Sequence, residues 1–255
     1  MYFYKVNYIL LLPRLIWKIW FASLMLVTIL IMYPFFYLYI VVLKNHKLAY
    51  LAGYQVWAKS VCFLIGVFPK IIGKDKLPSN ENYVMVSNHT SQLDIVVPFT
   101  LIKKSFAFLS KEELAKVPMF GIHFKGVHIT VNRKDIVSGL GALEDCIAAL
   151  KNDVSVLIFP EGTRSRKAPH MRPFKKGPFK IAIATGVPIV PLVFLDNYKR
   201  LGEGSLLKAK CGPGRARMVV LDPISTKGKT INDLQEVLDY TYQQVNNCLK
   251  EYELV

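Results

Sequence analysis

An uncharged apolar run near the amino terminus constrains the fold of this chain more than any other feature. Ile19 to Leu43 is a stretch of 25 residues without a charged side chain. As an α-helix, at about 1.5 Å per residue, it is long enough to cross a hydrocarbon core of roughly 30 Å. No small-residue cleavage site follows it, so we interpret it as an anchor and not as a signal peptide. Trp17 and Trp20, at one end, suit a lipid–water interface. A buried core helix is the alternative.

The mode of attachment stays open because Pro34 interrupts the run. A proline kinks a membrane helix or marks the point where the chain turns back. A second apolar stretch, Leu51 to Phe68, follows. The sequence therefore predicts a membrane anchor over residues 1–68, built as one span with an interfacial helix or as a helical hairpin dipped into one leaflet. Residues 69–255 are then predicted to form a separate domain.

The charge distribution indicates which partners the chain has. The net charge is +15 at pH 7, and the first acidic residue is Asp75. A basic body beside an acid-free apolar head favours an anionic membrane surface as partner. No zinc-finger spacing or RNA-binding signature supports nucleic acid. The four cysteines are far apart, which indicates reduced thiols and no metal site. We expect the protein at the inner, cytoplasmic membrane, with its domain facing the cytoplasm.

Beyond Phe68, short apolar runs alternate with helical periodicity, which is typical of an α/β domain. The predicted strands are Tyr83 to Ser87, Phe106 to Leu109, Val127 to Val131, Val154 to Phe159, Ile189 to Leu195 and Ala216 to Leu221. The predicted longer helices are Leu93 to Lys103, Ile136 to Lys151, Pro178 to Thr185 and Ile231 to Tyr252. Thr230 is predicted to cap the last of them.

The string NHTSQLD at residues 88–94 places a histidine and a carboxylate close together. His89 follows a predicted strand at the point where a helix begins, and Asp94 lies five residues later. The carboxylate can fold back to hold one ring nitrogen, which leaves the other nitrogen as a base. We expect free backbone N–H groups of this loop beside the ring. The alternative is a helix N-terminus capped by Asn88 or Thr90, with His89 uninvolved.

The string FPEGTRS at residues 159–165 follows the buried strand predicted at Val154 to Phe159. The ends of such strands are where α/β folds build their sites. Gly162 permits close approach of a ligand, Arg164 can bind phosphate bidentately, and Glu161 can accept a hydrogen bond from a hydroxyl. The alternative is an ordinary surface turn.

Two further blocks complete a pattern: GVHITVNR at residues 126–133 and VPIVP at residues 187–191. With these four blocks in this order, from about Gly73 to Ile224, the chain resembles the glycerolipid acyltransferase family, specifically the lysophosphatidate acyltransferases. The resemblance implies an α/β fold with a mixed sheet flanked by helices, preceded here by an N-terminal membrane-anchoring helical segment.

The resemblance implies transfer of a fatty acyl group from an acyl thioester, acyl-CoA or acyl carrier protein, to the sn-2 hydroxyl of lysophosphatidate. The product is phosphatidate for phospholipid synthesis, and no cofactor is implied. His89 is then the general base, and Asp94 orients it. Arg133 and Arg164 hold the acceptor phosphate, and Pro191 shapes the donor side. The implied substrate-binding residues are Arg133, Glu161, Gly162, Thr163, Arg164 and Lys111.

Several alternatives remain at this point. The acceptor can be another lyso-lipid, such as a lyso-ornithine lipid or a lysophospholipid, although the two arginines favour a phosphate. A non-catalytic membrane-binding scaffold needs neither His89 nor Asp94, and a hydrolase would use the same base on water. A dense basic stretch over residues 164–180 is either a solvated face or a contact for anionic headgroups, coenzyme A phosphates or acyl carrier protein.

Overall fold

The computed structural model describes residues 11–255 except 120, 125–127, 133–134, 206 and 208. Within this part of the chain, strands form one sheet in the order β1-β7-β6-β2-β5-β3-β4. Their bounds are β1 (Val67–Ile72), β2 (Val84–Ser87), β3 (Phe106–Lys111), β4 (Ile129–Val131), β5 (Ser155–Ile158), β6 (Ile189–Phe194) and β7 (Gly214–Val220). Strands β6 and β7 are antiparallel and the other neighbours are parallel, so the predicted mixed sheet is confirmed.

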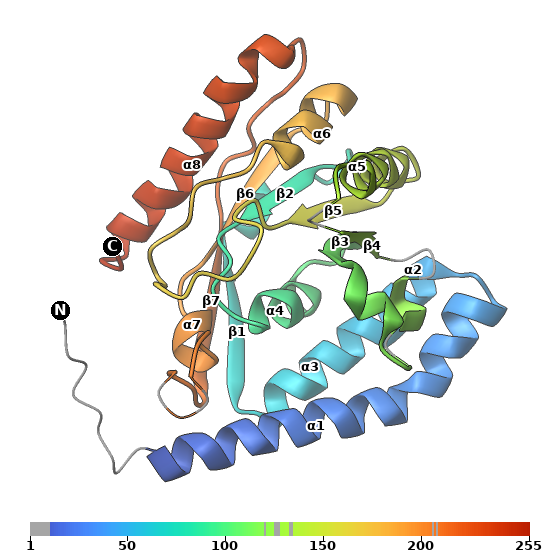
Figure 1. Cartoon of the computed structure of the whole chain (residues 1–255), viewed down its shortest axis with the longest axis vertical. Coiled ribbons are helices and arrows are strands. Elements are labelled where there is room, and N and C mark those ends of the chain that lie inside the picture. The colour runs from blue at the N-terminus through green and yellow to red at the C-terminus, as the bar shows by residue number, and fades with distance from the viewer. Residues whose placement is uncertain (1–10, 120, 125–127, 133–134, 206, 208) are drawn as a thin grey trace.

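Helices lie on both faces of this sheet (Figure 1). The α-helices are α1 (Leu11–Tyr37), α2 (His46–Leu48), α3 (Gln55–Leu64), α4 (Leu93–Leu101), α5 (Ile136–Lys151), α6 (Gly177–Thr185), α7 (Asn197–Arg200) and α8 (Leu234–Glu251). Two π-helical segments, Leu38–Val42 and Ala49–Tyr54, extend α1 and precede α3. Among the described residues, the 3₁₀ segments are Lys74–Lys76, Glu112–Lys116, Gly121–Phe124 and Ile231–Asp233.

The pleat of the central strands divides the apolar core into two halves. In β2, Met85 packs into the half that holds residues of α1, α3 and α4. Its neighbours Val84 and Val86 pack into the half that holds residues of α5, α6 and α8. A strand covered on both faces needs apolar side chains at every position, which is why these strands are continuous apolar runs in the sequence.

The amino-terminal segment is a helical hairpin laid against the domain. After α1 the chain turns back near Asn45, whose side chain accepts a hydrogen bond from Leu48 N at 2.9 Å, and returns through α2 to α3 (Figure 1). The turn therefore does not lie at Pro34, which is inside α1. Trp57 Nε1 donates to Thr28 Oγ1 at 3.1 Å, which ties α3 to α1.

The outer face of the hairpin is apolar and uncovered. Among the described residues, one helix is long and apolar enough to cross a membrane, the 32 residues Leu11–Val42, and 11% of its most apolar window is buried. Exposed apolar side chains on it include Leu12, Ile16, Leu26, Ile31 and Val42. Large exposed apolar patches mark contacts with other proteins or with membranes. Since the opposite side of α1 shares a core with the sheet, the division at residue 68 stays a prediction.

One strand was not predicted. β1 pairs along its whole length with β7, for example Val67 with Gly214, whereas Val67 and Phe68 were predicted to end the second apolar stretch and no strand was predicted before Tyr83. The helix ends were predicted better. Gly186 ends α6 in the left-handed conformation, and Thr230 forms a capping box with Asp233.

Candidate active site

Three neighbouring parallel strands end at the same edge of the sheet, where the carboxyl ends of strands in α/β folds build sites. His89 follows the end of β2, Glu161 follows β5, and Asn197 follows β6. The two strings that the sequence analysis singled out are therefore brought together by the pairing of β2 with β5. Asn197 adds a third segment that the strings did not include.

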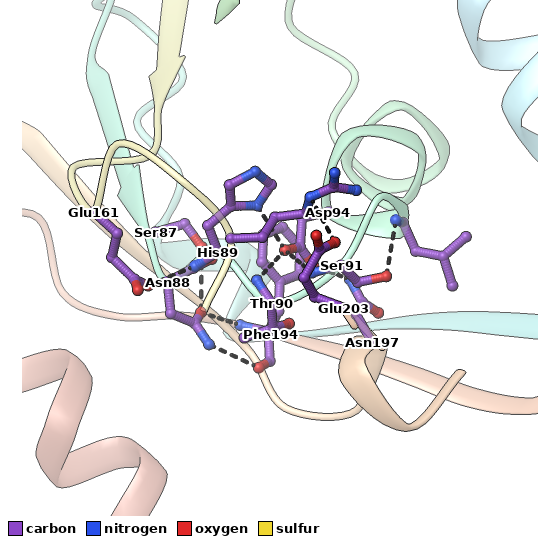
Figure 2. A network of polar contacts seen from close by, with 12 residues as sticks. Ser87, Asn88, His89, Thr90, Ser91, Asp94, Glu161, Phe194, Asn197 and Glu203 are labelled. Carbon is purple, nitrogen blue, oxygen red and sulfur yellow. Dashed lines mark hydrogen bonds and ion pairs between the residues drawn. The ribbon is translucent and has the colours of Figure 1, made fainter. Parts of the chain in front are cut away.

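His89 and Asp94 form a close pair. The distance from Nδ1 of His89 to Oδ2 of Asp94 is 2.9 Å, and the Asp94 side chain is fully buried while that of His89 is 12% exposed. Figure 2 shows the ring with one nitrogen toward Asp94 and the other pointing away from the polar network. Phe159 stacks on the ring with a centroid distance of 3.9 Å. The pair thus fixes the ring and leaves Nε2 on its outward edge.

The Asp94 carboxylate is held from several directions. Its Oδ2 also accepts hydrogen bonds from Thr90 N at 2.6 Å and Ser91 N at 2.8 Å, and its Oδ1 accepts from Asn197 Nδ2 at 2.8 Å. The expectation of free loop amides beside the ring is therefore wrong for Thr90 and Ser91. Their N–H groups position the carboxylate because the loop wraps around it.

Two asparagines support the loop. Asn88 does not cap the helix; it donates to Phe194 O at 3.1 Å and accepts from Phe194 N at 2.8 Å, which joins the end of β2 to the end of β6. Asn197 is fully buried at the start of α7. Sequence reasoning missed Asn197 because its partner is more than 100 residues away and no motif contains it.

The Glu161 carboxylate accepts hydrogen bonds from two backbone amides. Its Oε1 accepts from His89 N at 2.7 Å and its Oε2 accepts from Arg172 N at 2.9 Å, and the residue is 2% exposed. Burial raises the pKa of Glu161 to about 7, against the opposing effect of these two amides. Glu161 therefore joins the His89 loop to the segment that carries Arg172.

The remaining residues of the FPEGTRS string follow Glu161 in the same turn. Gly162 has φ +73°, a backbone conformation that residues with a Cβ rarely adopt, so this turn favours glycine. Thr163 is exposed. Arg164 Nε lies 3.0 Å from Glu203 Oε2, with both side chains partly exposed. Ser165 N donates to His89 O at 2.8 Å.

The other predicted site residues are less informative. Lys111 ends β3 at the same sheet edge, with β5 between β3 and β2, and its Nζ lies 2.8 Å from Glu113 Oε1 at the surface. Pro191 is buried inside β6 beside Val86 of β2. Arg133 and Gly126 lie outside the described residues.

A cavity of about 1210 Å³ lies elsewhere, between the hairpin turn and the start of β3. Its lining includes Leu43, Phe106 and Val154. Since Phe106 begins β3 and Val154 precedes β5, this cavity lies at the amino ends of the strands, away from the edge that carries His89. It is not part of the candidate active site.

Comparisons with known proteins show that this chain is similar to acyltransferases. The family described as Acyltransferase matches residues 69–195. A Caenorhabditis elegans protein provisionally named 1-acyl-sn-glycerol-3-phosphate acyltransferase is 32% identical over 76% of this chain and 68% of its own length. The chloroplastic 1-acyl-sn-glycerol-3-phosphate acyltransferase BAT2 of Brassica napus is 36% identical over 67% of this chain, which spans about half of that relative (48%).

A solved structure is similar over almost its whole length. It is the 1-acyl-sn-glycerophosphate (LPA) acyltransferase PlsC from Thermotoga maritima, with a TM-score of 0.67 and 25% identity. The match covers 88% of this chain and 95% of that chain.

Proposed function

This chain belongs to the glycerolipid acyltransferase family that includes the 1-acyl-sn-glycerol-3-phosphate acyltransferases, and on that premise we propose that it acylates lysophosphatidate to phosphatidate. The acyl group comes from a thioester, acyl-CoA or acyl carrier protein, and no cofactor takes part. The single observation that carries the proposal is the 2.9 Å contact from Asp94 to one nitrogen of His89, with the other nitrogen on the outward edge of the ring.

The reaction follows from that geometry. Nε2 of His89 takes the proton of the sn-2 hydroxyl as its oxygen attacks the thioester carbonyl carbon. The tetrahedral intermediate collapses, the C–S bond breaks, and the leaving thiolate takes the proton back from the imidazolium. Asp94 acts as a positioning residue that holds the ring and balances its charge while it is protonated. General-base catalysis of this kind contributes about 10² to 10⁴ in rate, and alignment of the two substrates contributes further.

Acceptor choice rests on Arg164, with Arg133 as its proposed second cation. Arg164 is paired with Glu203 at a partly exposed position, and such pairs contribute about 1 kcal/mol or less. A phosphate monoester binds the guanidinium bidentately, as a carboxylate does, but carries a second negative charge, so it competes well against one carboxylate. Thr163 and Lys111 are proposed as outer contacts. A different lyso-lipid is the alternative acceptor.

The hairpin supports attachment to one leaflet of the inner membrane. Its outer face carries the exposed apolar side chains, and its inner face packs on the domain. Helix α1 therefore lies along the surface of the domain and does not project away from it. We propose that the apolar face enters the cytoplasmic leaflet beside anionic lipids, with His89 on the cytoplasmic side. A lipid acceptor can then reach His89 from the membrane while a soluble donor arrives from the cytoplasm.

An assay of purified full-length protein in lipid vesicles tests the proposal. Lysophosphatidate, lysophosphatidylcholine and monoacylglycerol are offered with palmitoyl-CoA and with palmitoyl-carrier protein. We expect phosphatidate as the main product with at least one donor. Efficient acylation of lysophosphatidylcholine in place of lysophosphatidate would replace the acceptor, and no transfer with any pair would overturn the proposed function.

A further inference from the structure

The segment between β5 and α6 carries a surface of positive charge directly beside the candidate active site. Its exposed cations, here called the basic loop surface, are Arg166, Lys167, Arg172, Lys175, Lys176 and Lys180. The sequence contains no acidic residue between Glu161 and Asp196. Within the described part of the chain, none of these six side chains forms an ion pair, whereas Arg164 pairs with Glu203. Apart from the attraction between Arg172 and the buried Glu161 carboxylate, no ion pair among the described residues offsets this positive charge.

The loop is fixed in place, so these cations are presented on a firm backbone. Ser165 N donates to His89 O at 2.8 Å, and Lys175 N donates to Pro160 O at 2.9 Å. Phe174 is buried and packs edge-to-face on Tyr242 of α8, with centroids 5.0 Å apart. The backbone of the loop thus connects the basic surface to the His89 turn.

The position of the loop argues against the bilayer as its partner. Phe174 and Met171 pack into the half of the core that holds residues of α6 and α8. The apolar helix α1 packs into the other half, with α3 and α4. Figure 1 shows the loop beside α8 and the hairpin on the other side of the sheet. When α1 lies on the membrane, the part of the loop around Met171 and Phe174 packs on the far face of the sheet, which favours a soluble partner for the basic loop surface.

The exposure of the cations indicates the kind of soluble partner. Recognition of a single phosphate group uses partly buried arginines and backbone N–H groups that converge on it. Exposed charges that are spread over a loop and the first turn of a helix instead attract a partner with a large, oppositely charged surface and orient it as it approaches. We propose that the basic loop surface docks an acidic carrier protein, which delivers the acyl thioester to His89 on its prosthetic arm. This inference rests on the proposed acyltransferase function and selects one of its two donor classes.

The test compares two donors that carry the same acyl chain. The full-length double variant Arg166→Glu with Lys167→Glu is measured with palmitoyl-carrier protein and with palmitoyl-CoA, in identical vesicles. A second variant, Lys176→Glu with Lys180→Glu, guards against a local folding defect in the first. Lys74→Glu with Lys227→Glu is the matched control, since it makes the same charge change at exposed lysines of other segments.

We expect both loop variants to lower kcat/KM for the carrier-protein donor by about tenfold or more. The salt dependence of that rate should also flatten, because fewer charges then steer the encounter. Rates with palmitoyl-CoA and rates of the control variant should stay within about twofold of wild type.

Three results would overturn the inference while the proposed function stands. The first is an equal loss of kcat/KM with both donors. The second is that the loop variants bind vesicles less well while their kcat/KM for the carrier-protein donor is unchanged. The third is that wild-type protein uses palmitoyl-CoA but not palmitoyl-carrier protein. Absence of lysophosphatidate acylation by wild-type protein with either donor would instead be a failure of the proposed function.

Discussion

Asn197 donates a hydrogen bond of 2.8 Å to Oδ1 of Asp94, the carboxylate oxygen that does not contact His89. Among the described residues, the amide oxygen of Asn197 has no hydrogen-bond partner although it is buried. Leaving a buried polar atom unpaired costs about 1–3 kcal/mol. The hydrogen bond to Asp94 is the polar contact that the Asn197 side chain makes among the described residues. The hydrogen bond from Asn197 to Oδ1 and the contact of His89 with Oδ2 place the Asp94 carboxylate between Asn197 and the His89 ring.

Asn197→Ala should lower kcat by about tenfold, because loss of one charge-assisted hydrogen bond frees the Asp94 carboxylate to rotate away from His89. KM values for both substrates should change little, and the pH dependence of kcat should shift, since the environment of the base has changed. Asn152→Ala, at an exposed asparagine, is the control. An unchanged pH profile with a lower melting temperature would indicate that Asn197 has a structural role alone.

Arg164→Ala should raise KM for lysophosphatidate and leave KM for the acyl donor near wild type. Loss of a charge-assisted contact, roughly 1.5–3 kcal/mol, corresponds to one to two decades in acceptor kcat/KM. Arg164→Lys should restore part of the loss, since it returns the charge without the planar fork. Steady-state kinetics with each substrate varied in turn measures this, and a defect confined to the donor would contradict the assignment.

Glu161 should make stability depend on pH. Burial raises its pKa to about 7 from an ordinary value of 4.5, so the folded protein binds this proton more tightly than the unfolded chain. Its stabilising contribution is then fully present below about pH 4.5 and is lost as the pH rises through about 7. Relative to Glu161→Gln, wild type should lose up to about 3 kcal/mol between pH 5 and 8. Thermal unfolding of both proteins across this range tests it; a stability difference that does not change with pH would show that Glu161 is ionised throughout.

Membrane attachment should survive high salt, because it depends on the apolar face of α1 more than on charge. Ile16→Glu with Ile31→Glu, at two exposed positions of that face, should release protein from vesicles and leave the helix packed on α3. Val117→Glu, at an exposed apolar position of another segment, is the comparison. Flotation with lipid vesicles measures the bound fraction. Release of wild type by 1 M NaCl, where the screening length is about 3 Å, would favour an electrostatic attachment instead.

Most of the sheet was predictable because each central strand is an apolar run bounded by turn residues, as in Val154 to Phe159 for β5. β1 was not predicted because Val67 and Phe68 continue an apolar stretch that reads as membrane segment. Its pairing with β7 is a contact between residues distant in the sequence, and no local pattern reports it.

The His89 and Asp94 contact was predictable, since both residues lie on one short loop. The contribution of Asn197 was not, and neither was the use of both Glu161 oxygens by backbone amides. Those contacts depend on how β2, β5 and β6 lie side by side. Short motifs identify the groups that carry out chemistry, whereas the residues that position them come from other strands.

The most direct test of the whole account is the transfer rate of His89→Ala in purified full-length protein, with lysophosphatidate and an acyl thioester in vesicles. Loss of a positioned general base should lower kcat by at least about 10², while vesicle binding and melting temperature stay near wild type. His170→Ala, at an exposed histidine, should retain full activity. A His89→Ala variant that keeps more than about a tenth of the wild-type rate would contradict the assignment of His89 as the base.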